Sequence, residues 1–378
     1  MPGDISPQPR LLAKASSSDA AQAEVIGLDQ EGRGVARVNG KVVFVDAALP
    51  GEHVELRPWR RKPRFDLANL TRILRASSLR VEPRCPHYER CGGCNLQHLD
   101  PRAQVAMKQR TLEENFQRIG KVQPDTLLAP IYGSDWGYRH RARLSIRMVP
   151  RKGGALVGFH ERRTHLVVDM NSCDILASRV SALIGPLRSL ISTLHLSTRI
   201  PQVEVAVGDE SLALCLRVLD PLPERDRNLL QEFAEAQDIG IYVQPGGPAS
   251  SYPVSETANR PLFYRLPEFD LRLEFRPRDF TQINHAINRV LVRRAVALLE
   301  PLGGQRVMDL FCGLGNFALA LARRGADVFG VEGSMDLVKQ AAGNAAANGL
   351  GEHASFICAD LTRDPATLFK QLGAFDAV

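Results

Sequence analysis

The chain has 378 residues, of which 44% are hydrophobic and 24% are charged. This composition indicates a folded globular protein of two to three domains and excludes a wholly disordered, collagen-like or coiled-coil chain. The net charge is +6, yet residues 300–378 carry six basic and nine acidic side chains, so the basic excess lies before them and favours a polyanionic partner there.

Residues 1–22 are polar and rich in Ser and Ala, which predicts a disordered tail. They lack the apolar core of a secretory signal, and no apolar run reaches the roughly 18 residues of a membrane span. We therefore expect a cytoplasmic protein without a membrane partner. Nothing in the sequence indicates an obligate protein partner, so we expect a monomer.

Residues 23–75 alternate short apolar runs with turns and predict about five strands. The Asn39-Gly40 pair between two apolar runs is a strong hairpin signal. So short a sheet would expose its edges unless it closed, which favours a small barrel. The run RPWRRKPRF (57–65) places five basic residues around Trp59. It predicts either an RNA contact or a solvated strand edge protected by charge.

Residues 101–119 predict a helix, because four apolar side chains recur on one face at helical spacing. Simple core packing is the preferred interpretation of that face. Its members are Val105, Leu112, Phe116 and Ile119.

Residues 137–170 contain a run with strict alternation, which predicts a strand with an apolar back and a basic front. The apolar side chains are Ala142, Leu144, Ile146 and Met148, and the basic ones are Arg139, Arg141, Arg143 and Arg147. Together with the 57–65 run, this front favours binding to nucleic acid over a merely solvated surface.

Seven cysteines are present, and an odd number in a cytosolic chain favours metal or thiol chemistry over a disulfide framework. They are Cys85, Cys91, Cys94, Cys173, Cys215, Cys312 and Cys358. The first three fall within ten residues, and the two glycines before Cys94 leave backbone amides available to face sulfur. Zinc would take His87 or His98 as a fourth ligand, whereas a [4Fe–4S] cluster would take a further cysteine. The spacing leaves zinc, iron–sulfur and unligated thiols open.

The last hundred residues alternate strands and helices in the pattern of a parallel sheet. Strands are expected at 306–311, 327–332 and 354–359, with helices from about 318 to 324 and from 335 to 348. Ligands of such sheets bind beyond the carboxyl ends of the strands. Gly313 and Gly315 stand at the first of these ends, Glu332 at the second and Asp360 at the third.

The spacing Gly313-x-Gly315-x-x-Ala318 fits both dinucleotide and S-adenosylmethionine sites. Asp309 stands four residues before the first glycine, which favours S-adenosylmethionine because the turn would then hold a methionine end. Glu332 is placed to accept both ribose hydroxyls. NAD remains the alternative on the pattern alone.

These features together resemble the bacterial 23S rRNA uracil-C5 methyltransferases of the RlmD (RumA) type, which carry an N-terminal TRAM domain. The resemblance covers roughly residues 23–378. The motifs that carry it are CPHYERCGGCNLQH (85–98), FHERRTHLVVDMNSC (159–173), FRPRDFTQIN (275–284), VMDLFCGLGNFAL (307–319) and VFGVEGS (328–334).

The resemblance implies a multi-domain α/β and β architecture. A TRAM RNA-binding barrel would occupy 23–75, a central α+β iron–sulfur domain 76–267, and a Rossmann-like S-adenosylmethionine domain 268–378, with helix 101–119 packing on the latter. It also implies 23S rRNA as partner and a [4Fe–4S] cluster ligated by Cys85, Cys91, Cys94 and Cys173. The implied S-adenosylmethionine contacts are Gln282, Phe311, Asn316, Glu332 and Asp360.

The implied reaction methylates C5 of a specific uridine and gives 5-methyluridine. A cysteine thiolate adds to C6 and makes C5 nucleophilic, the methyl group is transferred, and a base removes the C5 proton. The target base must first leave its stack. The cluster would be structural and would help to position the RNA.

One departure from the family pattern concerns the end of the sequence at residues 375–378, which opens the fourth strand in this family. The nucleophilic cysteine and the glutamate base follow later in the family, so the sequence is expected to be C-terminally truncated. Cys312 and Cys358 stand at strand positions where small buried residues are normal, and no catalytic residue is assigned. We expect this polypeptide to form no 5-methyluridine in uridine-containing rRNA.

Two other functions remain open. One is a non-catalytic RNA-binding iron–sulfur protein, and the other is an NAD-linked iron–sulfur oxidoreductase. Binding of S-adenosylmethionine rather than NAD, with Glu332 required, would distinguish the methyltransferase from the oxidoreductase.

Overall fold

The computed structural model describes residues 20–300, 303–362, 370 and 372–378. Its contacts divide the chain into two compact units. The first comprises the residues up to Tyr88 together with Cys94–Pro130, and the second comprises Glu89–Gly93 together with Ile131–Val378. Each unit is described by itself.

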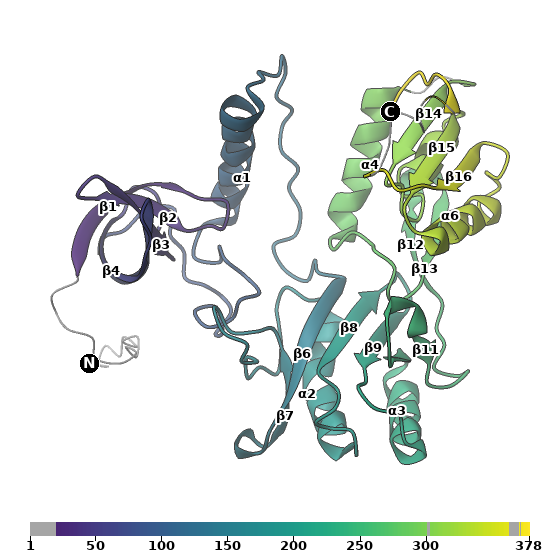
Figure 1. Cartoon of the computed structure of the whole chain (residues 1–378), viewed down its shortest axis with the longest axis horizontal. Helices are drawn as coiled ribbons and strands as arrows, with labels where there is room; N and C mark the ends of the chain where they lie inside the picture. The colour runs from purple at the N-terminus through teal and green to yellow at the C-terminus, as the bar shows by residue number, and fades with distance from the viewer. Residues whose placement is uncertain (1–19, 301–302, 363–369, 371) are drawn as a thin grey trace, which may run out of the picture. The chain divides into compact units, whose positions relative to one another are not determined.

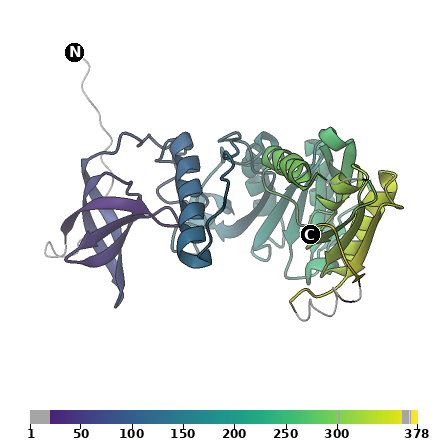
Figure 2. The ribbon, with the colours of Figure 1, turned by 90° about the horizontal axis from the view of Figure 1, so that it is seen from above.

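The first unit contains a closed barrel of five strands in the order β1-β2-β3-β5-β4 (Figures 1 and 2, purple). The strands are β1 (Ala21–Leu28), β2 (Gly34–Val38), β3 (Lys41–Asp46), β4 (His53–Arg61) and β5 (Phe65–Arg75). Inward-facing valine, leucine and alanine side chains fill it. The predicted barrel is thus confirmed, although β1 begins at Ala21, within the expected tail of residues 1–22. Residues 1–19 of that tail lie outside the described residues.

The turns of the barrel follow the local chemistry of the sequence. Asn39 and Gly40 have φ values of 49° and 80° between β2 and β3, so the predicted two-residue hairpin is confirmed. The basic run 57–65 forms the hairpin between β4 and β5, in which Trp59 is 41% exposed. Residues 53–56 of β4 pair with β1 and close the barrel. The basic hairpin begins at residue 57, beyond the part of β4 that pairs with β1.

The predicted helix at 101–119 is α1 (Pro101–Asn115), which continues into a π-helical turn at Phe116–Gly120. Asp100 caps its N-terminus by accepting from the backbone N–H of Arg102 at 2.9 Å. The expected core packing of its apolar face is wrong within this unit, because Leu112 is 50% exposed and none of the helix residues is buried. Polar and charged residues separate the apolar positions, so no continuous apolar stripe forms. Packing of α1 on the methyltransferase domain stays a prediction.

The second unit begins with a six-stranded sheet in the order β11-β10-β9-β8-β6-β7. Helix α2 packs on β7 and α3 packs on β10. The elements in chain order are β6 (Arg141–Val149), β7 (Gly154–Gly158), α2 (Ser178–Thr193), β8 (Gln202–Val207), β9 (Leu212–Arg217), α3 (Glu224–Gln237), β10 (Gly240–Gln244) and β11 (Tyr252–Pro253). The predicted alternating strand is β6, in which Ala142, Leu144 and Ile146 are buried.

A parallel sheet in the order β14-β15-β16 follows, next to an antiparallel hairpin of β12 and β13 (Figure 1). The bounds are β12 (Leu262–Leu266), β13 (Leu271–Phe275), α4 (His285–Leu299), β14 (Arg306–Leu310), α5 (Ala318–Ala322), β15 (Asp327–Glu332), α6 (Met335–Ala347) and β16 (Ala354–Cys358). Ala377 forms a parallel bridge with Val307, so the chain near residue 377 extends the sheet on the free side of β14. The predicted strand–helix alternation is confirmed.

One hydrophobic core joins the two sheets of the second unit. It contains side chains from β9, β10, β12 and β13 together with side chains from α4, β14 and α5. The predicted domain boundary at 267/268 falls in the turn between β12 and β13. The hairpin therefore packs with both sheets. No helix in the described ranges is long and apolar enough to cross a membrane.

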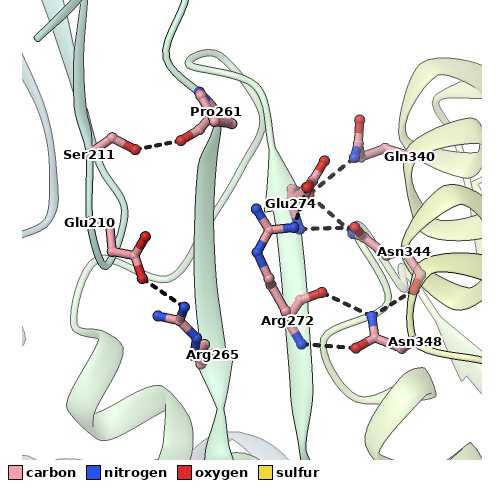
Figure 3. A network of polar contacts seen from close by, with 9 residues as sticks. All are labelled: Glu210, Ser211, Pro261, Arg265, Arg272, Glu274, Gln340, Asn344 and Asn348. Carbon is pink, nitrogen blue, oxygen red and sulfur yellow. Dashed lines mark hydrogen bonds and ion pairs between the residues drawn. The ribbon is translucent and has the colours of Figure 1, made fainter.

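The outer edge of β13 is paired by side chains of α6 (Figure 3). Asn348 accepts from the N–H of Arg272 and donates to its carbonyl, both at 2.9 Å. Asn344 makes the same two bonds with Glu274, at 2.9 and 3.1 Å, and Gln340 adds a third bond to the Glu274 carbonyl. The helix thus supplies hydrogen bonds that a neighbouring strand would otherwise supply.

Candidate functional site

The loop that follows β14 has three residues with positive φ. Gly313 and Gly315 have φ values of 56° and 89°, a conformation that glycine adopts without steric cost. Phe311 has φ 58° and its side chain is 68% exposed. A bulky residue in this conformation is strained, and such strain concentrates at functional sites. An added Cβ at Gly313 would meet nothing within 4 Å, so space beside the backbone is open to a ligand.

Glu332, the last residue of β15, fixes the shape of this loop. One carboxylate oxygen accepts from the backbone N–H of Gly313 at 3.1 Å, and the other accepts from the N–H of Ser334 at 3.1 Å. Each carboxylate oxygen can accept a further hydrogen bond. The side chain therefore connects the ends of β14 and β15 and keeps acceptor capacity toward solvent.

Asn316 closes the loop on its inner side. Its Oδ1 accepts from the Tyr264 hydroxyl and from Nδ2 of Asn288, both at 2.9 Å, and its own Nδ2 donates to Oδ1 of Asn288 at 2.9 Å. Tyr264 lies on β12 and Asn288 on α4, so three elements meet at one amide.

The other two predicted cofactor residues lie at exposed positions. Asp360 follows β16 and accepts from the backbone N–H of Thr362 at 2.9 Å and from its hydroxyl at 2.6 Å, which lowers the pKa of the carboxyl. Gln282 lies in the segment before α4, which Asn284 caps. Phe311 and Asp360 follow β14 and β16, and Glu332 ends β15, so these three residues lie at the carboxyl ends of adjacent parallel strands. Gln282 lies in the segment between β13 and α4.

The segment that carries Gln282 is anchored by Arg278. Its Nη1 donates to Glu204 on β8 at 2.8 Å and to Gln244 on β10 at 2.7 Å. Two arginines of the predicted basic front share the same carboxylate: Arg143 at 2.9 Å and Arg141 at 3.7 Å. Arg141, whose side chain is 17% exposed, thus turns to the buried Glu204 and does not face outward, whereas Arg143, 65% exposed, pairs with Glu204 from the surface.

The remaining two arginines of that front differ from each other. Arg139 donates from Nε to the carbonyl of Arg141 and lies 5.5 Å from the centre of the Phe159 ring. Arg147 is exposed on β6 and stays a candidate for RNA contact.

Behind the loop, burial suppresses ionisation. Burial raises the pKa of Asp309 to about 6, although its carboxylate accepts from the Ala318 N–H at 3.0 Å. Asp309 lines a largely apolar cavity of about 130 Å³ between α4, β14 and α5. Burial together with Asp309 and Glu332 raises the pKa of Cys312 to about 12, so its thiol is a poor nucleophile at neutral pH.

The cysteine loop is held by a short hairpin at residues 158–168. The N–H of Gly92 donates to the His160 carbonyl at 2.9 Å, and Arg162 donates from Nε to the Cys91 carbonyl at 3.1 Å. The N–H of Gly93 donates to Sγ of Cys91 at 3.4 Å, which confirms that an amide of the Gly-Gly pair faces sulfur. A Cβ at Gly93 would lie 3.0 Å from the Phe159 ring, so glycine allows this close approach.

The cysteines predicted to share a centre divide between the two units. Cys91 and Cys173 are buried in the second unit, and Cys85 and Cys94 belong to the first. Among the described residues, no three His, Cys, Asp or Glu side chains form a metal-binding group. His98, a predicted alternative ligand, is buried with Nδ1 at 2.5 Å from the Tyr88 hydroxyl.

Comparisons with known proteins agree with the two-part organisation. Residues 22–79 match a family model of the TRAM domain of tRNA (uracil(54)-C(5))-methyltransferase, and residues 307–378 match a methyltransferase domain. The 23S rRNA (uracil(1939)-C(5))-methyltransferase RlmD of Dechloromonas aromatica is 50% identical over 353 residues, which are 93% of this chain and 82% of that protein. The RlmD of Cupriavidus metallidurans is 49% identical over 98% of this chain and 80% of that protein.

The chain belongs to the RlmD family of S-adenosylmethionine-dependent RNA uracil-C5 methyltransferases. The predicted resemblance to this family is confirmed. The crystal structure of Pyrococcus abyssi tRNA (uracil-54, C5)-methyltransferase in complex with S-adenosyl-L-homocysteine matches with a TM-score of 0.66. It covers 89% of this chain and 79% of that chain at 22% identity, which shows a common fold.

Sequence reasoning missed several residues that shape this site: Glu204, Tyr264, Asn288 and Arg162. An isolated acid in the apolar strand QVEVAV was a signal for Glu204, since a buried charge requires partners. Asn288 stands four residues before Val292 and eight before Val296, so it shares their helical face, which was a second signal.

Proposed function

We propose that this chain binds its cofactor and its RNA for one reaction: methylation of C5 of a specific uridine in 23S rRNA, with S-adenosylmethionine as methyl donor and 5-methyluridine as product. The observation that carries this proposal is the hydrogen bond from the Gly313 N–H, in the loop after β14, to the carboxylate of Glu332. It occurs in a chain that is 50% identical to a named RlmD over 93% of its length. We propose that the protein is cytoplasmic, because its rRNA substrate is found there. We also propose that it binds 23S rRNA as a monomer.

The cofactor supplies an electrophilic methyl group, and the residues of this chain bind and orient it. We assign the ribose hydroxyls to Glu332, whose carboxylate oxygens keep acceptor capacity, and the adenine side to Asp360. Phe311 is exposed next to the loop and offers a ring for the adenosyl group. Asn316 and Gln282 complete the proposed contacts. The contacts of Asp360, Glu332 and Phe311 are assigned in the order in which the carboxyl ends of β16, β15 and β14 lie along the sheet.

For the chemistry at uracil, we propose the covalent route in which a cysteine thiolate adds to C6 and makes C5 nucleophilic. None of the described cysteines is assigned to this role. Cys312 is buried with a raised pKa. Cys358, expected at a buried strand position, is instead exposed, and it donates its thiol hydrogen to the carbonyl of Gly333 at 3.6 Å.

Binding of S-adenosylhomocysteine to the 378-residue chain tests the cofactor site. We expect Glu332→Gln to weaken binding by at least about 100-fold, because the amide cannot accept two N–H bonds and two ribose hydroxyls as the carboxylate does. Isothermal titration calorimetry measures the affinity, with Glu352→Gln at an exposed position as the matched control. Tighter binding of NAD than of S-adenosylhomocysteine would contradict the proposal and favour the oxidoreductase.

We also propose that Cys85, Cys91, Cys94 and Cys173 bind a [4Fe–4S] cluster. Two features support a thiolate site: the Gly93 N–H donates to Sγ of Cys91, and the Cys91 loop is tied to the 158–168 hairpin by backbone hydrogen bonds. The cluster would hold the loop for RNA and would take no part in electron transfer.

Anaerobically purified protein is expected to be brown, with a broad absorbance band near about 400 nm and matching iron and sulfide contents. Cys173→Ala should lose most of this absorbance, whereas Cys215→Ala, which removes another buried thiol on β9, should retain it. Stoichiometric zinc in place of iron and sulfide would show that the metal assignment is wrong.

We propose two RNA-binding surfaces: one on the barrel, at residues 23–75, and one at the exposed arginines of β6. Trp59 offers a stacking surface within the basic hairpin, and Arg147 offers a phosphate contact. A chain that binds 23S rRNA fragments but neither S-adenosylmethionine nor S-adenosylhomocysteine would instead be a non-catalytic RNA-binding protein. We propose the predicted division into residues 23–75, 76–267 and 268–378 for the three functional parts.

A further inference from the structure

The amide of Asn316 is held in one orientation by two buried partners. The Tyr264 hydroxyl and Nδ2 of Asn288 both donate to its Oδ1 at 2.9 Å. Asn288 is 3% exposed and Tyr264 is 5% exposed, so water does not compete for these bonds. The reciprocal bond from Nδ2 of Asn316 to Oδ1 of Asn288 completes a two-bond amide pair.

The valence of the amide then decides what Asn316 can offer a ligand. Both lone pairs of Oδ1 are used, and one of the two Nδ2 hydrogens is used by Asn288. The remaining capacity is a single N–H donor. Rotation of the Asn316 amide alone by 180° would place an N–H against the N–H of Asn288, so the donor stays in place as long as Asn288 keeps its own orientation.

The position of Asn316 selects the part of the cofactor that this donor meets. In the proposed function, Asp360 lies at the adenine and Glu332 lies at the ribose. The turn at Gly313 and Gly315, just before Asn316, is the part that the sequence predicts to hold the methionine end. The amino-acid end offers an ammonium group, which is only a donor, and a carboxylate, which is only an acceptor. A lone N–H donor fits the carboxylate alone.

We infer that Tyr264 and Asn288 are positioning residues that fix Asn316 as a hydrogen-bond donor to the carboxylate of S-adenosylmethionine. The inference rests on the proposed function. It assigns a role in cofactor recognition to β12 and α4, in addition to the carboxyl ends of β14, β15 and β16. It also explains why Tyr264, a buried tyrosine beside a loop, keeps its hydroxyl pointed at an amide rather than at water.

Two ligands separate this role from general support of the fold. S-adenosylhomocysteine contains the carboxylate, whereas 5′-methylthioadenosine retains the adenosine and sulfur but lacks the amino-acid end. Tyr264→Phe should weaken S-adenosylhomocysteine about tenfold, as expected for one lost hydrogen bond of about 1.4 kcal/mol, and change 5′-methylthioadenosine less than about twofold. Asn316→Asp should weaken S-adenosylhomocysteine more strongly, because an acceptor then faces the carboxylate, and should again spare 5′-methylthioadenosine.

Tyr242→Phe is the matched control, because this buried tyrosine of the same core donates to Oδ1 of Asn259 at 2.6 Å. It should leave both affinities unchanged. Equal weakening of both ligands in Tyr264→Phe, or unchanged S-adenosylhomocysteine binding in both variants, would overturn the inference while the proposed function stands. Failure of the unaltered chain to bind S-adenosylhomocysteine would overturn the proposed function and the inference together.

Discussion

Replacing Glu204 with alanine is expected to lower the free energy of unfolding by about 3–5 kcal/mol. Its carboxylate accepts from Arg143 and Arg278, and Arg141 lies 3.7 Å away. The Arg141 and Arg278 side chains are only 17% and 16% exposed. Nη1 of Arg141 and Nε of Arg278 already have no acceptor in the described part of the chain, so no spare partner would replace the carboxylate. Urea denaturation followed by circular dichroism measures the loss.

The matched control removes a glutamate from a solvent-exposed ion pair. Glu210 contacts Arg265 at 2.7 Å, but their side chains are 63% and 45% exposed (Figure 3). Glu210→Ala should change stability by less than about 1 kcal/mol. If the two variants lost similar stability, the arginine cluster would not depend on Glu204. Because Arg278 anchors the segment of Gln282, we also expect Glu204→Ala to weaken S-adenosylhomocysteine binding.

The second large effect is expected at Asn344, which is 1% exposed. Asn344→Ala should lower the free energy of unfolding by about 2–4 kcal/mol, because it leaves the N–H of Glu274 without its acceptor and removes a donor from two carbonyls. Those carbonyls belong to Glu274 on β13 and to Leu314 in the cofactor loop. Thermal unfolding at neutral pH, compared with urea denaturation, measures the loss.

Gln340→Ala is the control for Asn344, since Gln340 makes one bond of 3.2 Å to the same Glu274 carbonyl and is only half-buried. We expect a loss below about 1.5 kcal/mol. An Asn344→Ala variant as stable as Gln340→Ala would mean that water or a shifted helix replaces the amide. The side-chain pairing would then contribute little to the fold.

The sequence predicted those elements whose signals are local. Asn39-Gly40 predicted the hairpin between β2 and β3, and the strand ends at Glu332 and Asp360 followed from apolar runs and their polar ends. A cofactor turn at Gly313 and Gly315 was likewise expected from their spacing, and both residues have positive φ there. These features depend on residues within a few positions of one another, so a single sequence is enough to predict them.

The features that were missed depend on partners far apart in the chain. Glu204 binds Arg143 and Arg278, which lie 61 and 74 positions away, and Asn316 binds Tyr264 from 52 positions away. Periodicity placed Arg139 and three arginines of β6 on one front but could not reveal the acid opposite two of them. For α1, helical spacing identified a face without showing that the described residues leave Leu112 and Ile119 of that face exposed.

The amides of α6 have a consequence for association between chains. The backbone groups of Arg272 and Glu274 point away from β12, and on an open edge they would accept a strand from another molecule. Asn344 and Asn348 occupy those groups, so in the folded protein this side of the hairpin offers no template for an intermolecular β-sheet.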